Sequence, residues 1–211
     1  MRQITKENGE MPGMLKLRKG NKVPFPEMLS EGYMHEDDRI TANVSADKLK
    51  AVLAHFIAVH KEPLFFILEL PSNLKRQKIL RPGVMEAFQN DVYYIDGCTQ
   101  EKAVAILEKT ADILINDGMS SFGFGCHESH DEIMVGKYNV VTVFCSNPKV
   151  YEGFFEQHEI HEDAQLVTAW DTFRKNHYGE SKRVDTDGKN IFDIPDMLKD
   201  MGIFLAGKRE A

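Results

Sequence analysis

The hydrophobic positions of the first half of the chain alternate between continuous runs and a helical spacing. ITANV (40–44) is typical of a strand, and LFFILEL (64–70) is a continuous apolar run of the kind found in buried strands. Between the two runs, apolar residues recur at spacings of three and four, which predicts a helix over about 46–60 with one buried face. The positions of this face are Leu49, Val52, Leu53, Phe56 and Ile57. The segment 40–70 is therefore predicted to be a β-α-β unit.

The same order recurs over 92–126. VYYID (92–96) and SSFGFGC (120–126) are strand-like, and the apolar positions between them are Val104, Leu107, Ala111, Leu114 and Ile115. Ser45 in the first unit and Thr99 in the second each stand where a side chain can cap the following helix. Any two capped amphipathic helices share these features, so an internal duplication stays open.

Beyond residue 126 the pattern favours strands and turns. Apolar runs flank Gly136-Lys137, which predicts a hairpin, and Asp187-Gly188 predicts a second one. Asn147-Pro148 is typical of a helix start, and QLVTAWDTF (165–173) is strand-like. We predict a single α+β domain: a mixed β-sheet with two β-α-β crossovers, a C-terminal antiparallel meander and helices mainly on one face.

The expected organisation is a polar N-terminal lead over 1–38 and one domain over 39–206. Within that domain, the β-α-β units 40–70 and 92–126 precede a meander and helices over 127–206. The 211 residues are 42% hydrophobic and 28% charged, as is normal for a globular chain. The three cysteines, Cys98, Cys126 and Cys145, have no paired spacing and adjoin apolar residues, so we expect buried free thiols.

The formal charge of −7 bears on partners. It opposes the basic surface that phosphate binding requires, so nucleic acid is not an expected partner, whereas a basic protein or a cation is compatible with it. The longest apolar run, 64–70, contains Glu69 and is too short to cross a membrane. The N-terminus has no apolar stretch of signal-peptide length. We therefore expect a soluble cytoplasmic protein without a membrane partner.

The candidate site is the turn HESH (127–130) after the third predicted strand. If the strand after each helix runs parallel to the strand before it, this turn lies beside the end of strand 92–96, and strand 165–173 delivers its last residues to the same edge. The candidate pocket residues are His127, Glu128, His130, Asp131, Trp170, Asp171 and Asp96.

A metal site is one interpretation of this turn. His127 and His130 are the candidate ligands, with Asp131 or Asp171 as the third, for zinc or another divalent cation. The spacing is one residue shorter than the two-histidine helix motif of metalloproteases, and turns are normally polar, so two solvated histidines are the favoured alternative. No cofactor is assigned. A helix starting at Pro148 would place the similar HEIH (158–161) at the opposite end of the domain, about 16 Å away.

Gly123 and Gly125 interrupt the strand before the turn. Glycine in a strand often marks the close approach of a backbone or a ligand, but here it also lets Phe122, Phe124 and Cys126 pack on one face, and we favour packing. Cys126 then faces the core, away from its neighbour in the turn, which disfavours thiol catalysis.

Two functional hypotheses remain. The preferred one is a non-enzymatic binding or interaction module, such as an acidic inhibitor or immunity-type protein, that masks a basic partner through acid-rich loops such as HEDD (35–38) and HEIHED (158–163). The alternative is a small hydrolase or metal-dependent enzyme with its site at the His127–Asp131 turn. Convergence of the side chains of His127, His130, Asp131 and Asp171 would favour the enzyme. Oligomeric state and substrate do not follow from the sequence.

Overall fold

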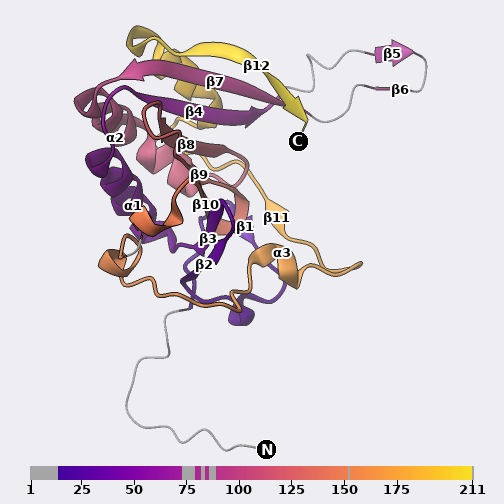
Figure 1. Cartoon of the computed structure of the whole chain (residues 1–211). Helices are drawn as coiled ribbons and strands as arrows, with labels where there is room; N and C mark the ends of the chain where they lie inside the picture. Colours follow the sequence, from indigo (N-terminus) through magenta and orange to yellow (C-terminus); the bar gives the residue numbers. More distant parts are fainter. Residues whose placement is uncertain (1–13, 73–78, 82–83, 86–88, 152, 211) are drawn as a thin grey trace, which may run out of the picture.

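An eight-stranded antiparallel sheet forms the centre of the molecule (Figure 1). The computed structural model describes residues 14–72, 79–81, 84–85, 89–151 and 153–210. The strand order is β12-β7-β4-β8-β9-β10-β3-β2. The bounds are β2 (Gly32–Glu36), β3 (Arg39–Asn43), β4 (Leu64–Pro71), β7 (Gln89–Cys98), β8 (Ser121–Cys126), β9 (Glu132–Val135), β10 (Val140–Phe144) and β12 (Phe204–Glu210). Two small pairs lie apart from this sheet: β1 (Asn21–Lys22) with β11 (Glu180–Ser181), and β5 (Ile79–Arg81) with β6 (Val84–Met85).

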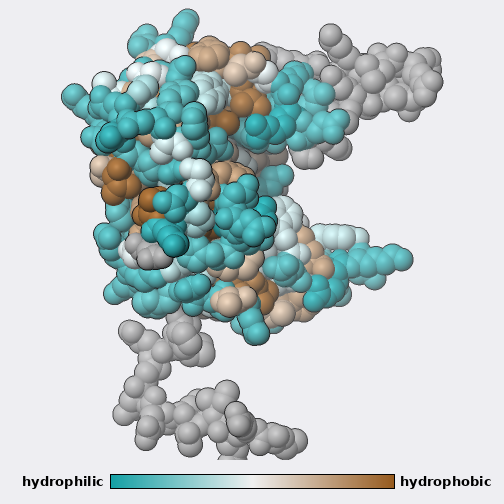
Figure 2. Space-filling view, in the orientation of Figure 1, coloured by the Kyte–Doolittle hydropathy of each residue, from teal (hydrophilic) through white to brown (hydrophobic). Residues whose placement is uncertain are grey.

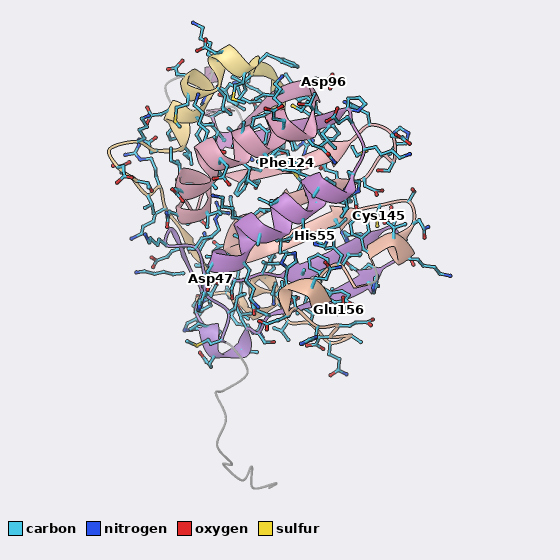
Figure 3. The ribbon with its side chains drawn as sticks, turned by 90° about the vertical axis from the view of Figure 1, so that its left-hand side faces the viewer. Asp47, His55, Asp96, Phe124, Cys145 and Glu156 are labelled. Carbon is cyan, nitrogen blue, oxygen red and sulfur yellow. The ribbon has the colours of Figure 1, made fainter. Side chains whose placement is uncertain are left out.

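Helices cover one face of the sheet. α1 (Ala46–Val59) and α2 (Gln100–Asn116) lie side by side in front of the strands (Figure 3). The shorter helices are α3 (Ala169–Thr172) and α4 (Ile194–Met197). Short 3₁₀ helices span Pro26–Met28, Lys137–Asn139, Pro148–Tyr151, Glu156–His158, Ile191–Asp193 and Lys199–Met201. Along the described chain, no helix is long and apolar enough to span a membrane.

The predicted crossovers are present. β3 and β4, which flank α1, run in the same direction with β8, β9 and β10 between them. β7 and β8, which flank α2, also run in the same direction, with β4 inserted between them. Because a strand of opposite direction always intervenes, every neighbouring pair is antiparallel, whereas we had expected a mixed sheet. β8, β9 and β10 form the predicted meander, so the α+β class is confirmed.

The sequence predicts the buried face of α1 fully and that of α2 in part. All five predicted positions of α1 are buried. In α2, Leu107, Ala111 and Leu114 are buried as predicted, whereas Val104 is exposed. Ala103 and Ile106, which were not predicted, extend the buried face. The Thr99 side chain accepts a hydrogen bond from the Lys102 amide (3.1 Å), as a cap should, whereas the Ser45 hydroxyl accepts one from the amide of Lys16.

The segment predicted as a polar lead contributes to the domain. β2 is the edge strand of the large sheet, and Arg18 is buried against Phe122 with its guanidinium 5.6 Å from the ring centre. The guanidinium donates to the carbonyls of Leu114, Ser120 and Gly136, and burial lowers its pKa to about 10. Residues 1–13 lie outside the described residues.

Two predicted elements are wrong. Residues 165–173 form no strand: Thr168 and Asp171 make a capping box in which the Thr168 amide donates to the Asp171 carboxylate (2.8 Å), and this starts α3. The helix expected after Pro148 is replaced by two 3₁₀ turns, and Gly153 between them has the left-handed φ of 78° that a continuous helix excludes. The turn at Asp187-Gly188 is confirmed by left-handed φ angles at both residues.

The glycines of β8 make room for neighbours. A Cβ added at Gly125 would lie 2.0 Å from Cζ of Phe65, and one at Gly123 would lie 1.9 Å from the Ile133 carbonyl oxygen. Phe122, Phe124 and Cys126 are buried on the opposite face of the strand, toward the helices. Packing, with close approach of the adjacent backbone, therefore explains both glycines. All three cysteines are free and buried, as expected.

Candidate functional site

The HESH segment is a tight turn between β8 and β9. The His130 amide donates to the Cys126 carbonyl (3.0 Å), and the Cys126 amide donates to the Asp131 carbonyl (2.8 Å). His130 takes the left-handed conformation, with a φ of 62°. The turn directs its side chains to two faces of the sheet: His127 contacts Phe65 on the face away from the helices, whereas Asp131 points toward the end of α1.

The predicted neighbourhood of His127 and Asp96 is present. His127 Nε2 lies 2.6 Å from Asp96 Oδ1, and both side chains are about half exposed. The hydrogen bond from His127, together with one from the Gly97 amide, lowers the pKa of Asp96. Because solvent screens an exposed pair of this kind, the contact positions the turn more than it stabilises the fold.

Asp131 belongs to a buried polar cluster with His60 and Tyr151. Tyr151 donates its hydroxyl to Asp131 Oδ2 (3.1 Å), and His60 Nε2 lies 3.2 Å from the same oxygen. The Tyr151 hydroxyl is also 3.0 Å from His60 Nε2. All three side chains are buried, so the cluster ties the end of α1 to the turn after β8 and to the segment after β10.

Hydrogen-bond roles in this cluster follow from the fixed groups around it. His60 Nδ1 lies 2.8 Å from the Phe56 carbonyl, which can only accept, so Nδ1 carries a proton. Burial and the nearby Asp131 raise the pKa of Tyr151 above its usual range, so the phenol remains a donor. Both ring nitrogens of His60 are therefore engaged, Nδ1 with the Phe56 carbonyl and Nε2 with Asp131 and Tyr151.

A pocket of about 300 Å³ opens beside this cluster. Its lining residues are Val59, His60, Lys61, Cys126, Glu128, Ser129, Asp131 and Val150. Lys61 Nζ and Glu128 Oε1 form an ion pair (2.9 Å), and the buried Cys126 thiol donates to the Lys61 carbonyl (3.2 Å). The pocket thus combines a buried imidazole and carboxylate with a thiol, a hydroxyl and two valines.

The sequence singled out Asp131 and Glu128 of this pocket but missed His60 and Tyr151. His60 follows Phe56 by one helical turn at the C-terminus of α1, where a histidine side chain can bond the last carbonyl groups of the helix. Tyr151 lies in a 3₁₀ turn and carries no comparable signal.

Trp170 and Asp171 lie away from the HESH turn. The Trp170 ring packs edge-on against Tyr138 (5.0 Å between ring centres), in the turn at the opposite end of β9. Because 165–173 is not a strand of the sheet, Trp170 and Asp171 do not reach the sheet edge at which the HESH turn lies. Within the described ranges, no group of three histidine, cysteine, aspartate or glutamate side chains is placed to hold a metal ion. The ligand set built on His127 and His130 is therefore not assembled.

The second histidine pair, of HEIH, lies elsewhere. His158 Nε2 is 3.0 Å from His55 Nδ1 on α1, one turn before the end where His60 meets Asp131. Figure 3 shows His55 on this helix with Glu156 below it. Burial lowers the pKa of both His55 and His158, and the proximity of His55 lowers that of His158 further.

Both acid-rich loops meet at one edge of the sheet. HEDD (35–38) forms the turn between β2 and β3, and residues 161–163 run alongside β2. The Tyr33 amide donates to the His161 carbonyl (3.0 Å), and the Asp163 amide donates to the Tyr33 carbonyl (2.8 Å). We call residues 31–39 and 156–163 the acidic edge.

Charge is concentrated at the acidic edge. Its first segment, 31–39, has four acids and one arginine, and its second, 156–163, has four acids and neither lysine nor arginine, giving −3 and −4. The two segments sum to −7, and Lys48 on α1, which pairs with Glu31 (2.9 Å), reduces the charge at the folded edge to −6. Arg39 is bound by Glu36 (2.8 Å), and this hydrogen bond lowers the pKa of Glu36. Asp37, Asp38 and Glu162 are exposed and form no ion pair with any described residue.

Comparisons of the chain with protein-family models, with curated proteins and with solved structures gave no match.

Proposed function

We propose that this chain is a non-enzymatic binding module, of the inhibitor or immunity type, that holds a basic protein partner at its acidic edge. The observation that carries the proposal is the meeting of two acid-rich segments, far apart in sequence, through the bridge between Tyr33 and Glu162. Folding thereby brings the eight acidic residues of the two segments to one edge.

Electrostatics support a cationic partner. Like charges held together destabilise the folded state by mutual repulsion, and a bound cationic surface relieves that repulsion. Exposed charges also act over about 8 Å at physiological salt, far enough to steer an approaching basic protein. The acidic edge would thus attract a basic protein before contact, and the bound protein would neutralise the charge of the edge.

The backbone of β2 offers a second means of attachment. The outward amide and carbonyl of Tyr33 are bonded to residues 161–163. His35 lies two residues further along, so its backbone groups point to the same side, where no described residue pairs with them. An extended segment of a partner can add to the sheet at this position.

The test is a pull-down at low and high salt with two matched variants. The edge variant is Asp37→Asn, Asp38→Asn, Glu162→Gln, and the control variant is Asp112→Asn, Asp196→Asn, Asp200→Asn, which removes three exposed charges outside the edge. We expect a basic protein that the wild type and the control variant retain, that salt releases, and that the edge variant does not retain. Equal retention by the edge variant would contradict the proposal.

A small hydrolase with its site at the 127–131 turn is the second candidate. The observation that favours it is the pocket in which His60 and Asp131 stand beside Cys126 and Ser129. The Asp131 carboxylate lies beside such a nucleophile and can act as its general base, with His60 holding the carboxylate in place. Hydrolysis of p-nitrophenyl acetate that persists in a folded Ser129→Ala, Cys126→Ala variant at the wild-type rate would argue against it.

A further inference from the structure

Helices α1 and α2 lie on one side of the sheet (Figure 1), and four rings form a row on the opposite face. Phe65 on β4 stacks on Tyr94 of β7 (5.0 Å between ring centres) and meets His127 after β8 (5.0 Å). Tyr94 in turn lies 6.3 Å from Phe204 of β12. We call His127, Phe65, Tyr94 and Phe204 the aromatic stripe. The large face of the molecule seen in Figure 2 is mainly hydrophilic, with scattered hydrophobic patches.

The stripe results from strand alternation and register. Phe66 and Leu64 face the helices, so Phe65 between them points to the other face. Gly125 is directly opposite Phe65 on β8, and without a side chain it gives the ring room to lie flat over the strand. Tyr94 pairs with Ile67 on the same face, which brings its ring against Phe65.

Carboxylates flank the stripe. Glu132 is opposite Gly125 on β9, Asp96 binds His127, and Glu69 lies on the same face of β4. Burial, together with the nearby charges of Glu132 and Asp96, raises the pKa of Tyr94 to about 12, and these two effects on the phenol place both acids close to it. One cation, Arg209, pairs with Glu69 (2.6 Å).

Glu132 is the carboxylate of this group without a counter-ion. Its side chain forms no hydrogen bond or ion pair with any described residue, although it is half-buried. Burial raises its pKa, Glu69 adds to that effect, and Arg209 opposes it. Because Arg209 is paired with Glu69, a further cation that contacts Glu132 directly would stabilise this partly desolvated carboxylate.

We propose that the aromatic stripe binds an arginine side chain of a basic protein partner, with Glu132 as its counter-ion. The guanidinium is planar, so it can stack on the partly exposed ring of Tyr94, which covers the buried Phe65, while its N–H groups reach a carboxylate. The flanking acids disfavour a phosphate-bearing ligand on the same face. This inference rests on the proposed function, because it assumes a basic partner, and it assigns to that partner a second contact far along the sheet from the acidic edge.

The test uses N-acetyl-L-arginine amide as the probe and N-acetyl-L-citrulline amide as its neutral analogue. NMR titration of the full chain should shift the ring signals of Phe65 and Tyr94 with the arginine probe and leave them in place with the citrulline probe. Glu132→Gln should weaken binding about five-fold, the loss expected for one partly exposed ion pair. Glu128→Gln, which removes an exposed acid from the adjacent turn, should change affinity less than two-fold.

The outcomes separate the two proposals. Equal shifts with the citrulline probe, or unchanged affinity in a folded Glu132→Gln variant, would overturn the arginine site. Equal binding of N-acetyl-L-lysine amide would overturn the choice of guanidinium over ammonium. The titration needs no partner, so the two experiments are independent. Binding of the arginine probe together with a failed pull-down would contradict the proposal for the acidic edge alone. A successful pull-down together with no binding of the probe would contradict the proposal for the aromatic stripe alone.

Discussion

Replacing Tyr151 by phenylalanine tests whether the buried cluster holds three segments of the fold together. The substitution removes one hydroxyl, which lies 3.1 Å from Asp131 Oδ2 and 3.0 Å from His60 Nε2. The ring itself keeps its contact with Phe154 (5.5 Å between centres), so packing changes little. The variant therefore isolates the hydrogen bonds of the phenol.

The magnitude follows from burial and charge. Tyr151 is 1% exposed and Asp131 is 4% exposed, so water does not replace the lost donor. A buried hydrogen bond to a charged acceptor contributes about 1.5–3 kcal/mol, and we expect Tyr151→Phe to lower the free energy of unfolding by about 2 kcal/mol. For a domain of this size, that loss corresponds to a fall in Tm of roughly 4–8 °C.

Urea denaturation followed by far-UV circular dichroism measures the effect. The control is Tyr178→Phe at a tyrosine that is 69% exposed, where we expect a change below about 0.5 kcal/mol. In an Asp131→Asn background the effect of Tyr151→Phe should shrink, because the charged acceptor is gone. A free energy of unfolding for Tyr151→Phe equal to that of Tyr178→Phe would refute the reasoning.

Three further predictions concern stability. The folded-state pKa of Glu132 is raised, so its charge destabilises the fold as pH rises through that pKa. Glu132→Gln should therefore be more stable than wild type at pH 7.5 but not at pH 4, as measured by urea denaturation midpoints. The folded-state pKa values of His55 and His158 are lowered, so stability present above about pH 6.5 should be lost as pH falls through them, and His158→Gln should lose less between pH 7.5 and 5. Gly125→Ala should destabilise by about 1–3 kcal/mol in calorimetry, and less in a Phe65→Leu background, because its Cβ meets the Phe65 ring at 2.0 Å; equal losses in both backgrounds would count against that contact.

The local pattern of hydrophobic and polar residues is sufficient to predict the fold class and both β-α-β crossovers. The apolar stripe of α1 matched its buried face, and strand ends that flank one helix met at one edge, which is why Asp96 and His127 were placed together. The insertion of β4 between β7 and β8 was not predictable, since strand order depends on pairings distant in sequence.

The site was harder to predict because its members come from three separate segments. Asp131 was identified within the turn, but His60 is 71 residues and Tyr151 is 20 residues away from it in the chain. Trp170 is misplaced because 165–173 is predicted as a strand, whereas the capping box of Thr168 and Asp171 starts a helical turn there. Arg18, buried within a segment that looked polar and exposed, gave no periodic signal at all.

The salt dependence of partner binding tests the central claim most directly. With the captured partner purified, its affinity should be measured for wild type, for the variant with Asp37, Asp38 and Glu162 neutralised, and for the control variant, at about 50 and 300 mM salt, where exposed charges go from weakly to strongly screened. The acidic edge predicts a steep loss of affinity with salt for wild type and control, and weak binding with a shallow salt dependence for the edge variant. The same affinity and the same salt dependence in all three proteins would contradict it.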